Sequence, residues 1–168
     1  GTDVSLLNGV IHTIINENLY NKEYVETQTI GFDDLKKSTE NFSPENMEKI
    51  CGISAKRIRY LAREYAKSKS IIFWGMGISQ HTHGTDNARC LISLALLTGN
   101  IGLPGTGLHP LRGQNNVQGA SDAGLIPMFY PDYKSVEGDH QKKMSDYWHT
   151  ELDDKKGLTV VEIINAAY

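Results

Sequence analysis

Residues 70–77 read Ser-Ile-Ile-Phe-Trp-Gly-Met-Gly, a short β-branched and aromatic run followed at once by two closely spaced glycines. Such a run favours a buried strand, and the glycines favour a tight loop directly after it. Because Gly75 and Gly77 carry no side chain, backbone N–H groups there can approach a phosphate or the edge of a ring. We therefore predict a strand at 71–74 and a candidate cofactor-binding loop at Gly75, Met76 and Gly77.

The glycine pair does not by itself specify a ligand. A dinucleotide-binding fingerprint would place a glycine at position 80, where Gln80 stands, and no lysine follows in the spacing of a P-loop. A tight turn without any ligand is the alternative interpretation.

Helical patterns precede this strand. Apolar residues recur at helical spacing over residues 4–15, with Asp3 as the expected N-cap. Ser43, followed by proline at the first helical position, opens a short helix that Gly52 ends, and Ser54 caps a longer one.

Further helices and a glycine-rich segment follow the strand. Residues 86–98 are apolar on most sides, so this helix should be enclosed by other elements, and Gly99 ends it. Residues 102–124 are rich in glycine and proline and predict a long ordered loop. Long loops of this kind often have a function. A helix is expected near 141–149, and Thr159 caps the last one.

Length and charge limit the classes of function. With 168 residues, 39% of them hydrophobic, the chain can bury one core in one or two packed units. The formal net charge is -3, so the composition shows no excess of positive charge of the kind that binds nucleic acid. The apolar stretch at 90–97 is too short to cross a bilayer, so we expect no direct membrane insertion.

The two cysteines indicate a reducing compartment. Cys51 and Cys90 lack CxxC spacing, so they predict neither a disulfide framework nor a metal site, and we expect buried thiols and a cytoplasmic location. The chain begins without methionine and stops within an apolar helical pattern, ends that suit a piece of a longer protein.

A second candidate site lies at residues 111–122, which read Leu-Arg-Gly-Gln-Asn-Asn-Val-Gln-Gly-Ala-Ser-Asp. Arg112 is a permanent cation whose planar fork could hold a small carboxylate. Four carboxamides follow within six residues, and their donors and acceptors suit a pterin or guanine. Alternatively these side chains satisfy only the backbone of the loop, and the arginine is a surface ion-pair partner.

Other catalytic patterns are weak. His81 and His83 could bind a metal if a third ligand came from elsewhere, but no third ligand is evident in the sequence, and His109 is equally ambiguous. The alternative is that these histidines only form hydrogen bonds within loops. We therefore assign no metal ligand. There is no Gly-x-Ser-x-Gly elbow and no HExxH, so the sequence holds no self-contained catalytic set.

Three segments carry a family resemblance: Trp-Gly-Met-Gly at 74–77 with Gln80, Leu-Leu-Thr-Gly-Asn-Ile-Gly at 96–102, and Arg-Gly-Gln-Asn-Asn-Val-Gln-Gly at 112–119. In this order and spacing they resemble the catalytic (alpha) subunit of molybdenum- or tungsten-dependent formate dehydrogenases, a branch of the molybdopterin oxidoreductases. Shorter matches near the N-terminus extend the resemblance over essentially the whole chain.

The resemblance implies an enzyme that holds two molybdopterin guanine dinucleotides around one molybdenum or tungsten and oxidises formate to carbon dioxide. By resemblance, Arg112 is the catalytic arginine that orients formate. The residues implied to bind the cofactor are Gly75, Met76, Gly77, Gln80, Gly113 and Gln114.

The family's metal-ligating cysteine or selenocysteine and the cysteines of its [4Fe–4S] cluster are absent from this sequence. They should lie upstream of Gly1, so the isolated fragment should be inactive. The implied partners are formate and the electron-transfer subunits of the parent complex. The rivals are another molybdopterin oxidoreductase, such as a nitrate reductase-like enzyme, and a free-standing helical binding module.

The expected fold class is α/β: a helix-rich fragment of the molybdopterin oxidoreductase cofactor-binding domains, with at least one buried strand followed by a glycine loop. Residues 1–116 should form part of one α/β molybdopterin-binding domain. Residues 117–168 should form a loop and helices that could begin the neighbouring α/β domain.

Overall fold

Helices make up most of the chain. The computed structural model describes residues 1–168, which divide into two units, Gly1–Leu111 and Arg112–Tyr168. The first unit contains α1 (Asp3–Asn16), α2 (Lys22–Gln28), α3 (Phe32–Ser38), α4 (Pro44–Cys51), α5 (Ala55–Lys67), β1 (Ile71–Trp74), α6 (Met76–Ser79), α7 (Gly84–Thr98) and β2 (Gly107–Pro110). The second contains α8 (Val117–Asp122), β3 (Phe129–Tyr130), the 3-10 helix η1 (Pro131–Tyr133), β4 (Lys134–Ser135), α9 (Asp139–Trp148) and α10 (Val160–Ala166).

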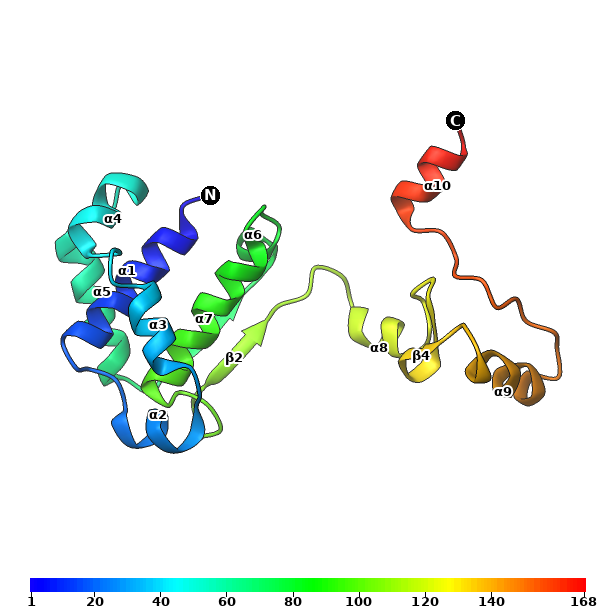
Figure 1. Ribbon diagram of the computed structural model, residues 1–168, viewed down its shortest axis with the longest axis horizontal. Coiled ribbons are helices and arrows are strands. Elements are labelled where there is room, and N and C mark those ends of the chain that lie inside the picture. The colour runs from blue at the N-terminus through cyan, green and yellow to red at the C-terminus, as the bar shows by residue number, and fades with distance from the viewer. The chain divides into compact units, whose positions relative to one another are not determined.

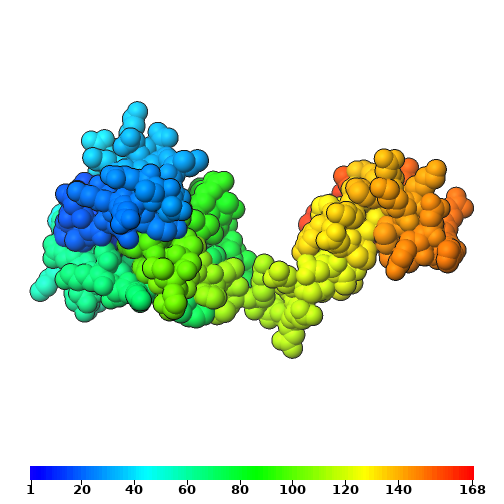
Figure 2. All heavy atoms as spheres, turned by 90° about the horizontal axis from the view of Figure 1, so that it is seen from below, coloured from blue at the N-terminus to red at the C-terminus, as the bar shows by residue number.

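The core of the first unit surrounds α1, which packs against α4, α5 and α7 (Figure 1). Ile11 and Ile14 of α1 and Ile58 of α5 are fully buried in this core. In the space-filling view, blue residues of the N-terminal region lie against green residues of the α7 region (Figure 2). The predicted apolar face of the first helix is therefore confirmed as the centre of the core.

Most of the expected helix ends are confirmed. The Ser43 side chain accepts a hydrogen bond from the Asn46 N–H, and Gly52 and Gly99 adopt the left-handed conformation that ends α4 and α7. The prediction for Asp3 was wrong, because Thr2 occupies the N-cap position and Asp3 is the first helical residue.

Two further details differ from expectation. Ser54 stands at the N-cap of α5, but its side chain accepts no capping bond; a Glu48 carboxylate oxygen of α4 accepts from the Ala55 N–H at 3.0 Å instead. Helix α7 is not enclosed on every side, since Ile92 is 40% exposed, and Leu61 of α5 also faces out of the core.

The predicted strand is confirmed as β1, and it pairs in parallel with β2, with Ile71 opposite Gly107 and Trp74 opposite Pro110. β2 lies inside the segment that the sequence predicts to be a loop. Gly-Leu-His-Pro has little intrinsic strand preference, so this strand forms through its pairing with β1. The four residues of β1 are alternately exposed and half-buried, with Phe73 60% exposed, so the strand is present but its predicted burial is not seen in this chain.

Asn100 fixes the start of β1 relative to the end of α7. Its side-chain oxygen accepts from the Ser70 N–H at 3.1 Å, and its amide nitrogen donates to the Thr98 hydroxyl at 2.8 Å. Asn100 is 4% exposed, so these bonds are shielded from water. The point at which the chain enters β1 is thereby set by a buried side chain.

The second unit has little core of its own. Its two short strands, β3 and β4, pair antiparallel, and α9 confirms the helix expected near 141–149. Thr159 and Glu162 form a reciprocal capping box at the start of α10, as the sequence predicts for Thr159, while the apolar side chains of α10 are exposed. In neither unit is any helix both long enough and apolar enough to span a bilayer.

The observed units divide between Leu111 and Arg112. Residues 112–116, which the sequence analysis grouped with the first segment, therefore belong to the second unit. The assignment of either segment to a domain of a larger protein stays a prediction.

Candidate functional site

The glycine segment after β1 folds as a single helical turn. Gly75 is extended, with φ -128° and ψ -155°, and α6 begins at Met76. Met76 and Gln80 lie together, since the Gln80 amide nitrogen donates to the Met76 sulfur at 3.2 Å. The sequence predicted a tight loop, and the structure shows that it is a short helix, which brings both of these side chains into contact.

This turn leaves room and donors for a ligand. A Cβ at Gly77 would meet nothing within 4 Å, and one at Gly75 would meet only the Leu111 carbonyl oxygen, at 3.9 Å. The backbone N–H groups of Met76 and Gly77, at the start of α6, donate to no group in the chain. A planar polar group could therefore approach the backbone closely at Gly77.

Helix α7 holds α6 in place through two residues. The buried Asn87 side chain donates from Nδ2 to the Ile78 carbonyl oxygen at 2.8 Å. Gly84 allows the close approach, because a Cβ there would lie 1.8 Å from the Ser79 carbonyl oxygen. The shape of the segment from Gly75 to Gln80 thus depends on the first turn of α7.

A pocket of about 460 Å³ lies at the start of α7 and is lined by Gly1, Val4, Ser5, His81, Thr82, His83, Asp86 and Asn87. Asn87 is 2% exposed, and its side-chain oxygen has no hydrogen-bond partner. A buried acceptor without a partner costs free energy, so this atom suits a ligand that brings an N–H group.

The histidines have protein partners. His81 Nε2 donates to the Gly77 carbonyl oxygen at 2.6 Å, and His83 Nδ1 lies 3.6 Å from an Asp86 carboxylate oxygen. The ring of His109 stacks on Phe73 with centroids 5.0 Å apart. No group of three or more His, Cys, Asp or Glu side chains is arranged to hold a metal ion.

The arginine segment belongs to the second unit. Arg112, Gly113 and Gln114 are exposed in irregular backbone before α8, and Arg112 forms no ion pair and no side-chain hydrogen bond. Of the four carboxamides, Asn116 caps α8 by accepting from the Gly119 N–H at 3.2 Å. For Asn116, the alternative in which the side chain satisfies the loop's own backbone is therefore the correct one.

The predicted site residues thus fall into two groups. Gly75, Met76, Gly77 and Gln80 are together in the first unit, and Arg112, Gly113 and Gln114 are together in the second. Sequence reasoning missed Gly84 and Asn87, which shape the first group. A glycine at the start of a helix, followed by an asparagine one turn later, is a possible signal, but this pattern alone does not distinguish a packing role from a functional one.

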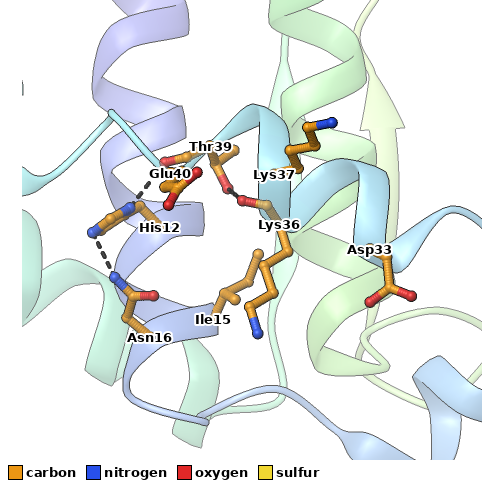
Figure 3. Close-up of a pocket in the computed structure, with 8 residues that line it drawn as sticks. All are labelled: His12, Ile15, Asn16, Asp33, Lys36, Lys37, Thr39 and Glu40. Carbon is orange, nitrogen blue, oxygen red and sulfur yellow. Dashed lines mark hydrogen bonds between the residues drawn. The ribbon is translucent and has the colours of Figure 1, made fainter.

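Another pocket, of about 400 Å³, lies between α1 and α3 and contains none of these residues (Figure 3). His12 bridges it: Nδ1 donates to the Thr39 carbonyl oxygen at 2.9 Å, and Nε2 accepts from the Asn16 amide at 2.7 Å. Both ring nitrogens form hydrogen bonds within the protein, and the bond to Thr39 joins α1 to the end of α3, so His12 stabilises the packing of these two helices.

Known proteins resemble this chain over its full length. The molybdopterin oxidoreductase family profile matches residues 1–168. The chain is 45% identical over 166 residues to F420-dependent formate dehydrogenase subunit alpha of Methanocaldococcus jannaschii and 47% identical over 170 residues to formate dehydrogenase H of Escherichia coli. These alignments cover 98% and 99% of this chain but 24% of each relative, so the chain spans about a quarter of their length.

The fold also resembles a solved structure. Acetylene hydratase from Pelobacter acetylenicus superimposes with a TM-score of 0.60 and 31% sequence identity, over 62% of this chain and 15% of that protein. The expected helix-rich α/β fold of molybdopterin oxidoreductases is confirmed by this similarity.

Proposed function

Because this chain belongs to the molybdopterin oxidoreductase family, we propose that the full-length protein containing it oxidises formate to carbon dioxide. Family membership implies a molybdopterin cofactor that carries molybdenum or tungsten. The proposal includes two guanine dinucleotide forms of the pterin, a [4Fe–4S] cluster with ligands outside this chain, electron-transfer subunits as partners, and a cytoplasmic location. It is supported by the two formate dehydrogenase relatives, which align with nearly all of the chain.

The observation that carries the proposal is the unpaired guanidinium of Arg112. Formate is a monoanion with two equivalent oxygens, and a guanidinium offers two parallel N–H groups that match them. Within its own unit Arg112 has no carboxylate partner, so its charge is available to bind a substrate anion. In this role Arg112 binds formate and fixes its orientation while the substrate loses one proton and two electrons.

The residues around α6 fit a pterin. A pterin presents N–H donors and ring acceptors on its edge, and the chain offers the unpartnered Asn87 oxygen as an acceptor. The N–H groups of Met76 and Gly77 supply donors beside the open space at Gly77. When bound, the metal cofactor supplies the acceptor for the two electrons, and the protein binds and orients it.

The sharpest test compares arginine variants of the full-length protein. We expect Arg112→Ala to lower kcat/KM for formate by about 100-fold or more, since a charge that binds the reacting anion is lost, with metal and pterin content unchanged. Arg112→Lys should recover part of this loss, because it keeps the charge without the planar fork. Formate oxidation is measured with an artificial electron acceptor.

Arg57→Ala provides the matched control. Arg57 is an exposed arginine on α5 without an ion pair, so this variant removes the same charge elsewhere and should keep wild-type kinetics. Wild-type kinetics in Arg112→Ala would remove Arg112 from the substrate site. A wild-type protein with bound cofactor that does not oxidise formate would contradict the proposed function as a whole.

A further inference from the structure

Asn116 is the first residue after the exposed Arg112 segment whose side chain forms a hydrogen bond. Asn116 is left-handed, with φ 50° and ψ 38°, a conformation that asparagine tolerates better than most residues. Its side-chain oxygen accepts from the Gly119 N–H at 3.2 Å, and its backbone oxygen accepts from the Ala120 N–H at 3.0 Å. Both the direction of the chain and the start of α8 are therefore set at this one residue.

Gly119 supplies the space that this turn needs. A Cβ at Gly119 would lie 2.5 Å from both terminal atoms of the Asn116 side chain. Gly119 does not have a positive φ, so the requirement is for room and not for backbone freedom. Any larger residue at position 119 would push the Asn116 side chain out of its capping position.

The far end of α8 is anchored within the same unit. The Leu125 N–H donates to the Ala120 carbonyl oxygen at 3.1 Å, and Gly124 approaches Pro131 so closely that a Cβ would lie 2.9 Å from its nitrogen. Helix α8 is thus held by contacts at both of its ends. The Arg112 side chain has no partner in this unit, and the exposed backbone from Arg112 to Asn115 enters α8 through the turn at Asn116.

We propose that Asn116 and Gly119 are a positioning pair that sets the direction of the backbone from Arg112 to Asn115 and thereby orients the Arg112 guanidinium toward formate. This inference rests on the proposed function, because it concerns the same substrate. Neither residue touches formate; each acts through the shape of the turn.

The test uses the full-length holoenzyme and three variants. Asn116→Ala loses both the cap and the tolerance for the left-handed conformation, Asn116→Gly loses only the cap, and Gly119→Ala displaces the cap. We expect kcat/KM for formate to fall about tenfold in Asn116→Ala and Gly119→Ala and less in Asn116→Gly, with metal and pterin content unchanged.

Gly119→Ala separates positioning from simple stability. Displacing the cap weakens α8, but alanine forms helices better than glycine by a similar amount, so the thermal stability of this variant should stay near that of the wild type. Lost activity with unchanged or higher thermal stability then arises from the turn. Ser121→Ala is the control, since it removes only a bond from the Ser121 hydroxyl to the Val117 carbonyl oxygen within α8 and should keep wild-type kinetics.

Two results would overturn the inference. Wild-type kcat/KM in Asn116→Ala and Gly119→Ala, in an enzyme that Arg112→Ala inactivates, would leave the proposed function standing and remove the positioning role. Loss of cofactor together with activity would assign the pair to folding instead.

Hydrogen exchange gives a readout that does not need formate. If the wild type fails to oxidise formate, the proposed function fails, and exchange of the amides from 113 to 119 still shows whether the pair orders this segment. We expect faster exchange in Asn116→Ala, most clearly at Gly119, and unchanged exchange would overturn the inference.

Discussion

Gly84→Ala should disrupt the turn at α6, the candidate cofactor site, while leaving the α1 core intact. The added Cβ would lie 1.8 Å from the Ser79 carbonyl oxygen, whereas real Cβ contacts stay above 3.0 Å, so α6 and the first turn of α7 must separate by at least about 1.2 Å. The obstacle is backbone, which cannot rotate away as a side chain could. Overpacking of this kind costs about 1–3 kcal/mol.

The same displacement should also impair function. The shift would break or lengthen the bond from Asn87 to the Ile78 carbonyl oxygen and would move the N–H groups of Met76 and Gly77. A displacement of about 1 Å at a site that positions a reacting group can reduce the rate by about 100-fold. We expect formate oxidation, or bound metal and pterin, to fall by about this factor.

The assay combines metal and pterin content, formate oxidation and thermal unfolding of the full-length protein. Thr85→Ala is the control, since Thr85 is exposed and adjacent in the same helix turn. A Gly84→Ala protein with the wild type's stability, cofactor content and activity would refute the reasoning, because α6 could not then lie so close to α7.

Two other predictions concern stability and thiol reactivity. The hydrogen bonds from Arg63 hold the pKa of Glu17 below its usual value, so this pair stabilises the fold above the unfolded pKa of about 4.3 and loses its effect as pH falls through the lowered folded pKa. Glu17→Gln should therefore cost about 0.5 kcal/mol in urea unfolding at pH 7 and nothing at pH 2; an equal cost at both pH values would contradict this. Burial raises the pKa of the Cys90 thiol to about 11, whereas Cys51 is half-buried, so iodoacetamide at pH 8 should label Cys51 first in the native protein. Equal labelling rates would show that Cys90 is accessible.

Local signals in the sequence were sufficient for most of the helices. Ser43, Gly52, Gly99 and Thr159 mark helix ends through their own backbone and capping chemistry, and the structure confirms all four. The prediction that Asp3 is the N-cap was wrong because Thr2 and Asp3 are adjacent and either residue type can precede a helix. Sequence alone does not place a helix boundary to within one residue.

Non-local contacts account for what the sequence could not predict. β2 has no strand signal of its own and exists because it pairs with β1 more than 30 residues away. The clamp of Asn87 on Ile78 is likewise visible only once α7 lies against α6. For the candidate site, the sequence predicted cofactor- and substrate-binding groups at Gly75 to Gln80 and at Arg112 to Gln114. Their roles toward cofactor and substrate stay predictions.

The parallel pairing of β1 with β2 has a consequence for the order of folding. A parallel pair needs a long crossover, here containing α7, so the pairing pays its loop-closure entropy before it gains any hydrogen bonds. The turn at α6 lies inside this crossover, so we expect it to acquire its final shape only after α7 has docked against it.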